Sequence, residues 1–157
     1  LRRQRQMCIR DSLIPGNTGN AIRLAAVTGA HLHLIRPLGF SFEDAHLRRA
    51  GLDYHDLAAV TVHDSFDEAL ATLPDIRIFA FTGRGTERHT DIEYSTNDLL
   101  LFGREDTGLP DWVLEHPRIT SMVRIPMLEA RRSLNLANSA SIAIYEAWRQ
   151  LGFPDGV

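Results

Sequence analysis

The sequence predicts an α/β fold built on a parallel sheet with helices on both faces. Short apolar runs alternate with segments whose apolar residues recur every three or four positions, as strands and helices do in such a sheet. The clearest case is 122–151, where a short apolar stretch, a polar loop and a long helical pattern follow one another. In open parallel sheets, loops of this kind gather at the carboxyl ends of the strands, where ligands usually bind.

Length and composition fit one soluble globular domain. The chain has 157 residues, of which 44% are hydrophobic and 24% charged, and these values are ordinary for a protein with its own core. No apolar run approaches the ~20 residues of a membrane span, and no secretory signal pattern is present. Cys8 is the only cysteine, so a disulfide within this sequence is impossible. We therefore expect a cytoplasmic protein that does not bind membranes.

Arginine carries all of the positive side-chain charge. All 17 cationic residues are arginine, yet the net charge is −3, which argues against a protein coated in positive potential. Genomic base composition can explain the bias, but a guanidinium also grips phosphate through two parallel hydrogen bonds. The local clusters to consider are Arg48 with Arg49, Arg84 with Arg88, and Arg131 with Arg132.

The first 12 residues differ from the rest of the chain. They are polar and basic, they lack strand alternation, and they abut Leu13 abruptly. We therefore expect residues 1–12 to be a non-native or disordered extension, and residues 13–157 to form a single domain. The alternative interpretation is a basic arm that contacts nucleic acid.

Arg23 falls within the first helix that the sequence predicts. Pro15, Gly16 and Gly19 mark a turn at the start of this helix, and Asn17 or Thr18 can cap it. Gly29 ends it. An arginine in the first turns of a helix is usually a solvated surface residue. The polar turn before it, however, can expose backbone N–H groups to a phosphate or carboxylate.

Strands and helices then alternate along the chain. The signals are short apolar runs bounded by turn residues for strands, and capping residues followed by a three-and-four spacing for helices. The expected elements are a strand at 31–35, a helix at 41–49, a strand at 59–63, a helix at 65–72 and a strand at 77–82. His31 and His33 share one face of the first of these strands, but no nearby ligand completes a metal site, so we expect none.

Polar or glycine-containing loops follow three strand ends, after Phe81, Phe102 and Ile125. Because the carboxyl ends of parallel strands share one edge, these loops form the candidate ligand site. Neither glycine loop has the spacing of the dinucleotide or P-loop fingerprints, so both types of nucleotide-phosphate enzyme are disfavoured. Ser133 or Asn135 can cap the last helix. The alternative interpretation of the loop between Ile125 and this helix is an ordinary connection that binds no ligand.

Three ordered motifs resemble those of the SPOUT RNA methyltransferases. They are Ile-Pro-Gly-Asn-Thr-Gly-Asn-Ala-Ile-Arg at 14–23, Phe-Gly-Arg-Glu-Asp-Thr-Gly-Leu-Pro at 102–110, and Arg-Ile-Pro-Met at 124–127 followed by Arg-Ser-Leu-Asn-Leu-Ala-Asn at 132–138. Within that superfamily the chain resembles the small stand-alone tRNA (cytidine/uridine-34) 2'-O-methyltransferases, which Leu-Arg-Arg-Ala-Gly-Leu-Asp-Tyr-His at 47–55 also indicates. The resemblance covers about residues 13–154.

The resemblance implies features of the fold and function that hydrophobic periodicity alone does not predict. It implies a parallel-sheet α/β fold whose C-terminal segment forms a trefoil knot, although chains generally avoid knots. It also implies S-adenosylmethionine as the cofactor, bound in the knot, and a homodimer whose active site lies near the subunit interface. The implied substrate is the anticodon stem-loop of tRNA, methylated on the ribose of its wobble nucleotide, with leucine isoacceptors expected.

The resemblance also assigns residues by position. It implies catalytic parts for Arg23, Ser133 and Asn135, with Arg23 supplied across the dimer. A guanidinium with a pKa above ~12 is a poor general base, so we interpret Arg23 as a clamp on the adjoining phosphate that lowers the pKa of the hydroxyl. Ser133 and Asn135 would hold the ribose or the methionine end. The implied cofactor-binding residues are Phe81, Thr82, Gly103, Gly108, Ile125, Met127, Ser133 and Leu134.

Two departures from the family pattern matter. The family begins with an apolar strand, which residues 1–12 replace here, although 7–14 is a partial substitute. The second motif usually reads Gly-Pro-Glu-Thr-x-Gly, whereas this chain places Arg104 and Asp106 around Glu105. Arg104 therefore adds a charge beside the expected pocket. Two alternatives remain open: a non-catalytic RNA- or cofactor-binding module of the same fold, and a ribosomal RNA 2'-O-methyltransferase.

Overall fold

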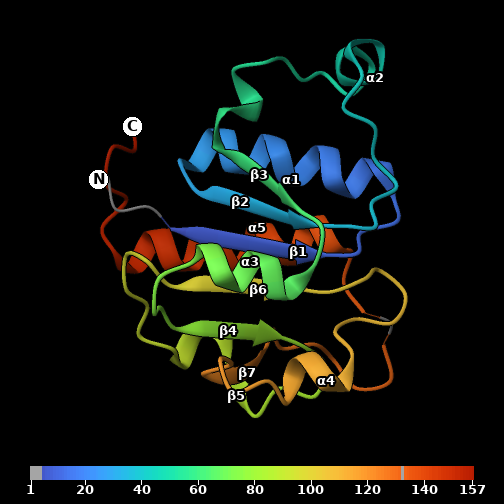
Figure 1. Cartoon of the computed structure of the whole chain (residues 1–157). Coiled ribbons are helices and arrows are strands. Elements are labelled where there is room, and N and C mark those ends of the chain that lie inside the picture. The colour runs from blue at the N-terminus through green and yellow to red at the C-terminus, as the bar shows by residue number, and fades with distance from the viewer. Residues whose placement is uncertain (1–4, 132) are drawn as a thin grey trace.

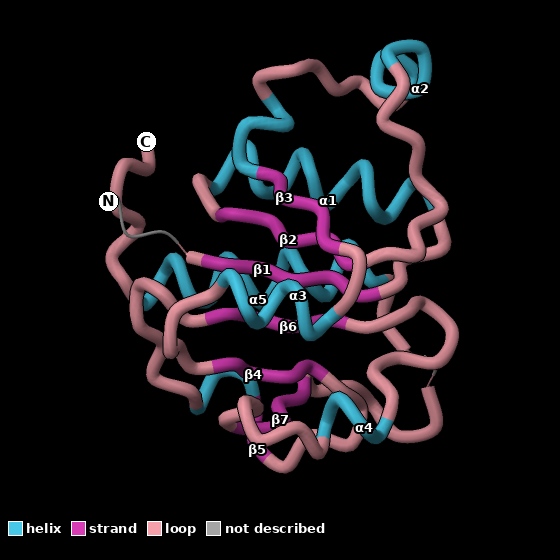
Figure 2. The backbone as a smooth tube through the Cα atoms, viewed as in Figure 1, coloured by secondary structure: helices cyan, strands magenta, loops and turns pink. Residues whose placement is uncertain are grey.

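The computed structural model describes residues 5–131 and 133–157 and shows one parallel sheet with helices on both faces (Figures 1 and 2). The strands are β1 (Gln6–Arg10), β2 (His31–Ile35), β3 (Val60–His63), β4 (Ile78–Phe81), β5 (Glu87–Arg88), β6 (Leu99–Phe102) and β7 (Ser121–Arg124). The helices are α1 (Pro15–Thr28), α2 (Asp44–Arg49), α3 (Phe66–Thr72), α4 (Asp111–Leu114) and α5 (Leu136–Gln150), with 3-10 turns η1 (Asp56–Ala59) and η2 (His89–Asp91). The predicted α/β fold class is confirmed.

The sheet has the order β3-β2-β1-β6-β4-β7-β5, and every neighbouring pair is parallel. Each parallel pair needs a crossover that returns the chain to the same edge, so helices cover the faces. Figure 1 shows α1 and α5 behind the sheet and α3 in front of it. Among the helices of the described residues, none is long and apolar enough to cross a membrane. The trefoil knot stays a prediction.

Strand β1 corrects the expectation that residues 1–12 form a disordered extension. Gln6–Arg10 pairs with β2 on one side and with β6 on the other, near the middle of the sheet. Met7, Cys8 and Ile9 are each at most 1% exposed. A parallel strand buried on both faces reads as a continuous apolar run and not as an alternating one. Three apolar residues between polar ones were too short a run for us to identify as a strand.

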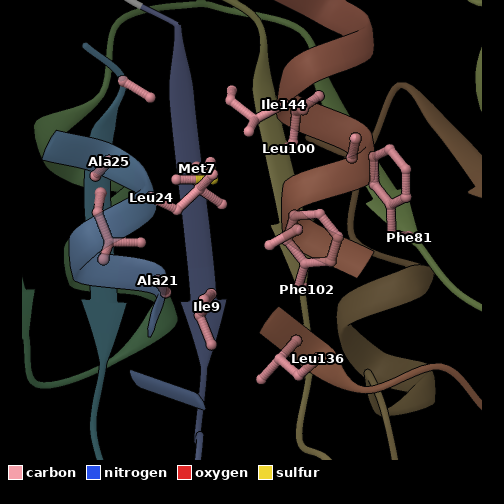
Figure 3. Packing of buried hydrophobic residues seen from close by; sticks show 14 of the residues in the cluster. Met7, Ile9, Ala21, Leu24, Ala25, Phe81, Leu100, Phe102, Leu136 and Ile144 are labelled. Atoms are coloured by element: carbon pink, nitrogen blue, oxygen red, sulfur yellow. The ribbon is translucent and has the colours of Figure 1, made fainter. Parts of the chain in front are cut away.

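Alternate residues of the central strands build two separate cores. Met7 and Ile9 point to the face that α1 and α5 cover, together with Leu100 and Phe102 of β6 (Figure 3). Cys8 points to the opposite face, in a cluster with residues of α3 and α4. Burial raises the pKa of the Cys8 thiol to about 12, so the thiol stays protonated and behaves as a small apolar group.

The two long helices begin and end at residues that suit their positions. Pro15 occupies the first turn of α1, where its missing N–H costs nothing, and Gly29 ends α1 in the left-handed conformation with φ 74°. Asn135, rather than Ser133, caps α5, since its side-chain oxygen accepts a hydrogen bond from the Asn138 amide at 3.2 Å. Ile14, and not Asn17 or Thr18, occupies the N-cap position of α1, so α1 starts three or four residues before the predicted position.

Truncation of a β6 side chain tests the second core. Leu101 is fully buried among residues of the α3 and α4 face. We expect Leu101→Ala to lower the free energy of unfolding by about 2–5 kcal/mol, because the substitution removes buried apolar surface and leaves a cavity. Urea titration measures this, with Leu128→Ala as the control because Leu128 is 77% exposed. Equal effects of the two substitutions would contradict the assigned packing.

Candidate functional site

The loops after β4, β6 and β7 enclose a cavity of about 620 Å³ at the carboxyl edge of the sheet. Strand β4 lies between β6 and β7, so the three loops leave neighbouring strands although the sequence separates them widely. A volume of this size is that of a site for a small ligand or cofactor.

The structure brings together all eight residues that the family resemblance assigned to the cofactor. The residues Phe81, Thr82, Gly103, Gly108, Ile125, Met127, Ser133 and Leu134 all line this cavity. They come from three loops that the sequence separates widely, which explains why no single motif in the sequence reveals the site. Their binding of a cofactor stays a prediction.

Two stacked aromatic rings form the apolar base of the cavity. Phe81 ends β4 and Phe102 ends β6, and their ring centroids lie 4.8 Å apart with an angle of 25° between the ring planes. Both side chains are buried. Met127 and Leu134 line the cavity but remain 37% and 39% exposed. A bound ligand with an apolar part would cover these side chains, which favours binding.

The turn after β6 needs its glycines. A β-carbon added at Gly103 would lie 2.3 Å from the Gly108 carbonyl carbon, so only glycine fits there. Gly108 has φ 68°, a conformation that residues with a side chain rarely adopt. The Gly108 amide donates to the Arg104 carbonyl at 2.9 Å and closes the turn. The result is a tight backbone wall for the cavity.

The Glu105 carboxylate joins this turn to the start of α1. It accepts hydrogen bonds from the Ser12 hydroxyl at 2.6 Å, the Leu13 amide at 2.8 Å, the Ile14 amide at 3.1 Å and the Asn17 side-chain amide at 3.1 Å. An anion at the amino end of a helix also interacts favourably with the helix dipole. Glu105 therefore fixes the amino end of α1 against the cavity wall.

These contacts determine the charge state of Glu105. Partial burial acts to raise the pKa of its carboxyl, but the hydrogen bonds from Ser12, Leu13 and Asn17 outweigh burial, and the pKa lies below its ordinary value. The carboxylate is therefore ionised at neutral pH. It is also the acceptor of several hydrogen bonds, so it is a structural group rather than a free general base.

Two of the three arginines that line the cavity, Arg84 and Arg104 but not Arg124, form ion pairs with aspartates in the described part of the chain. Arg84 contacts Asp111 at 2.6 Å, which links the loop after β4 to α4. Arg104 contacts Asp106 at 3.0 Å within the glycine turn. Both pairs are largely exposed, so each contributes little to stability. Their effect is to neutralise two positive charges beside the cavity.

The three residues with predicted catalytic parts are not all in one place. Ser133 lines the cavity. Asn135 caps α5 and is not among the lining residues of the described chain. Arg23 is exposed on α1, and its guanidinium donates to the Gly51 carbonyl. Arg132 lies outside the described residues. Arg23 and Asn135 therefore do not reach the cavity of their own chain.

The paired histidines of β2 have a packing role here. His33 Nδ1 lies 3.0 Å from His63 Nε2, and His33 Nε2 lies 2.7 Å from the Gln6 side-chain oxygen. Burial, with the nearby His31 and His63, lowers the pKa of His33 to about 3, so His33 is neutral. In the part of the chain that the structure describes, no group of three or more His, Cys, Asp or Glu side chains is placed to hold a metal ion.

Sequence reasoning missed the partners of Glu105 and the paired aspartates. Ser12 lies in the segment set aside as an extension, and Asp111 had no motif to mark it. The usable signal for Glu105 was its survival in the family motif despite the changes beside it. Contacts between residues about 90 positions apart give no local sequence signal.

The fold and the cavity define an α/β protein with a small-ligand site formed by loops at the carboxyl edge of its sheet. The chain belongs to the SpoU rRNA methylase family, whose model matches residues 7–145. This match confirms the resemblance found in the three motifs. It also includes Met7, so the family pattern extends into strand β1.

Relatives and solved structures agree with this family. The chain is 49% identical over 146 residues to a tRNA (cytidine(34)-2'-O)-methyltransferase of Yersinia pestis, with 90% of each chain covered. A structure described as giving insight into 2-OH methylation of C/U34 on tRNA matches with TM-score 0.86, 43% identity and coverage of 96% and 98%. An AdoMet-bound rRNA methyltransferase of Sinorhizobium meliloti matches with TM-score 0.77 and 25% identity, over 94% of this chain and 57% of that one.

The Glu105 contacts predict a pH-dependent stability difference. At neutral pH we expect Glu105→Gln to lower the free energy of unfolding by about 1–3 kcal/mol, because a charged acceptor of several hydrogen bonds is lost. The folded pKa lies below the unfolded one, near 4.3, so this contribution is present above about pH 4.3 and is lost as the pH falls through the folded value. Denaturant titrations of both proteins across that range measure the difference.

Glu115→Gln is the matched control, since no side-chain hydrogen bond is found for Glu115, an exposed residue of the described chain. Its difference from the wild type should stay near zero at every pH. If the difference in free energy of unfolding between Glu105→Gln and the wild type grew as the pH fell, this would contradict the structural role assigned to Glu105.

Proposed function

We propose that this chain transfers the methyl group of S-adenosylmethionine to the ribose 2'-oxygen of the wobble nucleotide, position 34, of tRNA. The observation that carries the proposal is the cavity at the carboxyl edge, where the eight residues assigned by family resemblance converge. Membership of a methylase family and 49% identity to a tRNA (cytidine(34)-2'-O)-methyltransferase support it. Leucine isoacceptors as substrates and a cytoplasmic location are part of the same proposal.

The cavity suits S-adenosylmethionine by size and chemistry. Its volume, its stacked aromatic base and its glycine-built wall fit a ligand with a flat heterocycle and a flexible polar chain. Phe81 and Thr82, Gly103 and Gly108, and the segment from Ile125 to Leu134 would hold it. When bound, the cofactor supplies an electrophilic methyl group on a sulfonium. The protein has to align the attacking oxygen and help to remove its proton.

Arg23 is the residue to which we assign activation of the ribose hydroxyl. A guanidinium has only hydrogen-bond donors and no acceptor site, so Arg23 cannot remove the proton itself. It can hold the phosphate next to the ribose and so stabilise the developing alkoxide. A backbone phosphate then accepts the proton. Ser133, at the cavity, would hold the ribose or the methionine end, and Asn135 would keep the start of α5 in place.

We infer that two copies combine to complete the site. Arg23 lies outside the cavity of its own chain, on a helix that packs against α5. Exposed apolar side chains lie on these two helices: Val27 is 56%, Ile142 39% and Tyr145 42% exposed. Burying such side chains between two copies is favourable. In this dimer Arg23 of one subunit acts on a ribose at the cavity of the other.

The direct test is methyl transfer from labelled S-adenosylmethionine to total tRNA, with mass mapping of the product. We expect ribose methylation at position 34. Methylation of ribosomal RNA alone would favour the alternative that the family description names. Cofactor binding without transfer to either RNA would favour a non-catalytic module.

Substitution of Arg23 tests its assigned role. We expect Arg23→Ala to reduce methyl transfer at least ~1000-fold while S-adenosylmethionine affinity stays unchanged, because Arg23 lies outside the cavity. Arg23→Lys keeps the charge without the planar fork and should retain partial activity. Steady-state kinetics and calorimetry measure these. Wild-type turnover by Arg23→Ala would show the assignment to be wrong.

Two glycines of the cavity provide a matched pair for cofactor binding. Gly103→Ala should abolish S-adenosylmethionine binding, because its β-carbon would collide with the backbone of Gly108. Gly83→Ala should leave binding unchanged, since Gly83 also lines the cavity but its β-carbon would meet nothing within 4 Å. Calorimetry measures both affinities, after circular dichroism has shown that both variants fold.

The Arg23→Ala and Gly103→Ala variants together test whether the site is completed across a dimer. An equal mixture of Arg23→Ala and Gly103→Ala chains should recover about a quarter of the wild-type rate, because half of the dimers are mixed and each of these has one complete site. No recovery in the mixture would contradict action across the interface.

A further inference from the structure

Helix α2 docks by its carboxyl end on the amino-terminal half of α1. A β-carbon added at Gly19 of α1 would lie 3.7 Å from the Ala50 β-carbon. One helical turn further along α1, the Arg23 guanidinium donates to the Gly51 carbonyl. Two arginines, Arg48 and Arg49, therefore immediately precede the segment that contacts Arg23. Figure 1 shows α2 standing away from the sheet, at the top of the view.

These arginines have no carboxylate partner. Arg48 and Arg49 are exposed, and within residues 5–131 and 133–157 no ion pair involves either of them or Arg23. The only hydrogen bond of Arg49 within this part of the chain is a long one, 3.4 Å, to the Ala45 carbonyl. Arg23 and the two arginines of α2 thus belong to segments in contact with one another, and none of the three has an ion-pair partner within the described residues.

The acidic residues of the same segment are engaged elsewhere. The Asp44 carboxylate accepts from the Tyr54 hydroxyl at 2.8 Å. Asp53 accepts from the His55 amide at 2.8 Å, and Asp56 accepts from the Asp53 amide at 2.9 Å. Asp44 begins α2, and Asp53 and Asp56 lie in the turn after it. Within the described residues no ion pair joins these acids, or Glu43, to either arginine. The acids therefore leave the arginines available to an anion from outside the chain.

We propose that Arg48 and Arg49 form a phosphate-contact surface that holds the RNA backbone beside Arg23. The proposal rests on the proposed function and names the part of the protein that grips its substrate. Arg23 has to meet the phosphate next to the methylated ribose, and neighbouring phosphates of the same strand follow within a few ångström. Guanidinium groups fixed to α1 through Ala50 and Gly51 are placed to meet them.

The surface holds the RNA and takes no part in the chemistry. Arg48 and Arg49 therefore affect the affinity for RNA and KM, whereas Arg23 affects kcat. Phosphate contacts release counterions, so their number is measurable from the salt dependence of binding. An apolar or hydrogen-bonding contact to a base would lack this dependence.

The experiment measures binding of an anticodon stem-loop RNA to the full-length chain between about 50 and 200 mM salt. We expect the double variant Arg48→Ala/Arg49→Ala to bind at least about tenfold more weakly. The slope of log affinity against log salt should become shallower by about 1 for each arginine. The kcat at saturating tRNA and the S-adenosylmethionine affinity should not change.

Two controls separate charge from position. Arg48→Lys/Arg49→Lys keeps the charges and should keep most of the salt slope. Arg118 lies just before β7, toward the opposite edge of the sheet, and its guanidinium donates to the Pro74 carbonyl. Arg118→Ala should leave RNA affinity unchanged. Both arginines of α2 are exposed, so the double variant should fold, and its denaturation midpoint checks this.

Wild-type affinity and salt slope in the double alanine variant would overturn the proposal, and so would an equal loss in Arg118→Ala. A wild-type chain that transfers no methyl group to tRNA would contradict the proposed function instead. The binding measurement needs no turnover, so it decides on the α2 surface in either case.

Discussion

The structure of the site depends on one carboxylate. Glu105 lies in the turn after β6, and its oxygens receive hydrogen bonds from Ser12, Leu13, Ile14 and Asn17. These contacts satisfy the backbone amides of Leu13 and Ile14, just before α1, and join that end of the helix to the cavity wall. Because α1 also carries Arg23, one ionised group fixes the helix with the activating guanidinium relative to the cavity within each chain.

Most of the fold follows from short-range sequence signals. Gly29 marked the end of α1, and Ser65, at the start of the predicted helix 65–72, does accept from the Glu68 amide of α3 at 3.1 Å. Strand β1 did not follow from such signals. Its three buried residues lie between polar ones, and its place between β2 and β6 depends on pairing with strands about 25 and 90 residues away along the sequence. Pairing of that kind leaves no local pattern.

The cavity could be located from the sequence, because three predicted strands end in polar loops and parallel strands bring such loops to one edge. The residues within each loop came from family resemblance. The resemblance implied that Arg23 is supplied across the dimer, but nothing in the sequence indicated that Asn135 lies away from the cavity that Ser133 lines. Helical periodicity in the sequence shows which residues share one face of a helix. The orientation of that helix relative to other elements is set by distant contacts such as those of Glu105.

The arginines at the cavity and those on α2 differ in their ion-pair partners. At the cavity, Arg84 and Arg104 are each compensated by an aspartate, so two guanidinium groups there do not repel a ligand that carries a sulfonium. On α2, Arg48 and Arg49 lack such partners. A protein that binds a cationic methyl donor and a polyanionic substrate has to separate these two electrostatic environments. Within the described residues, two of the three arginines that line the cavity have an aspartate partner, whereas Arg48 and Arg49 have none. This difference suits both needs, even in a chain whose net charge is −3.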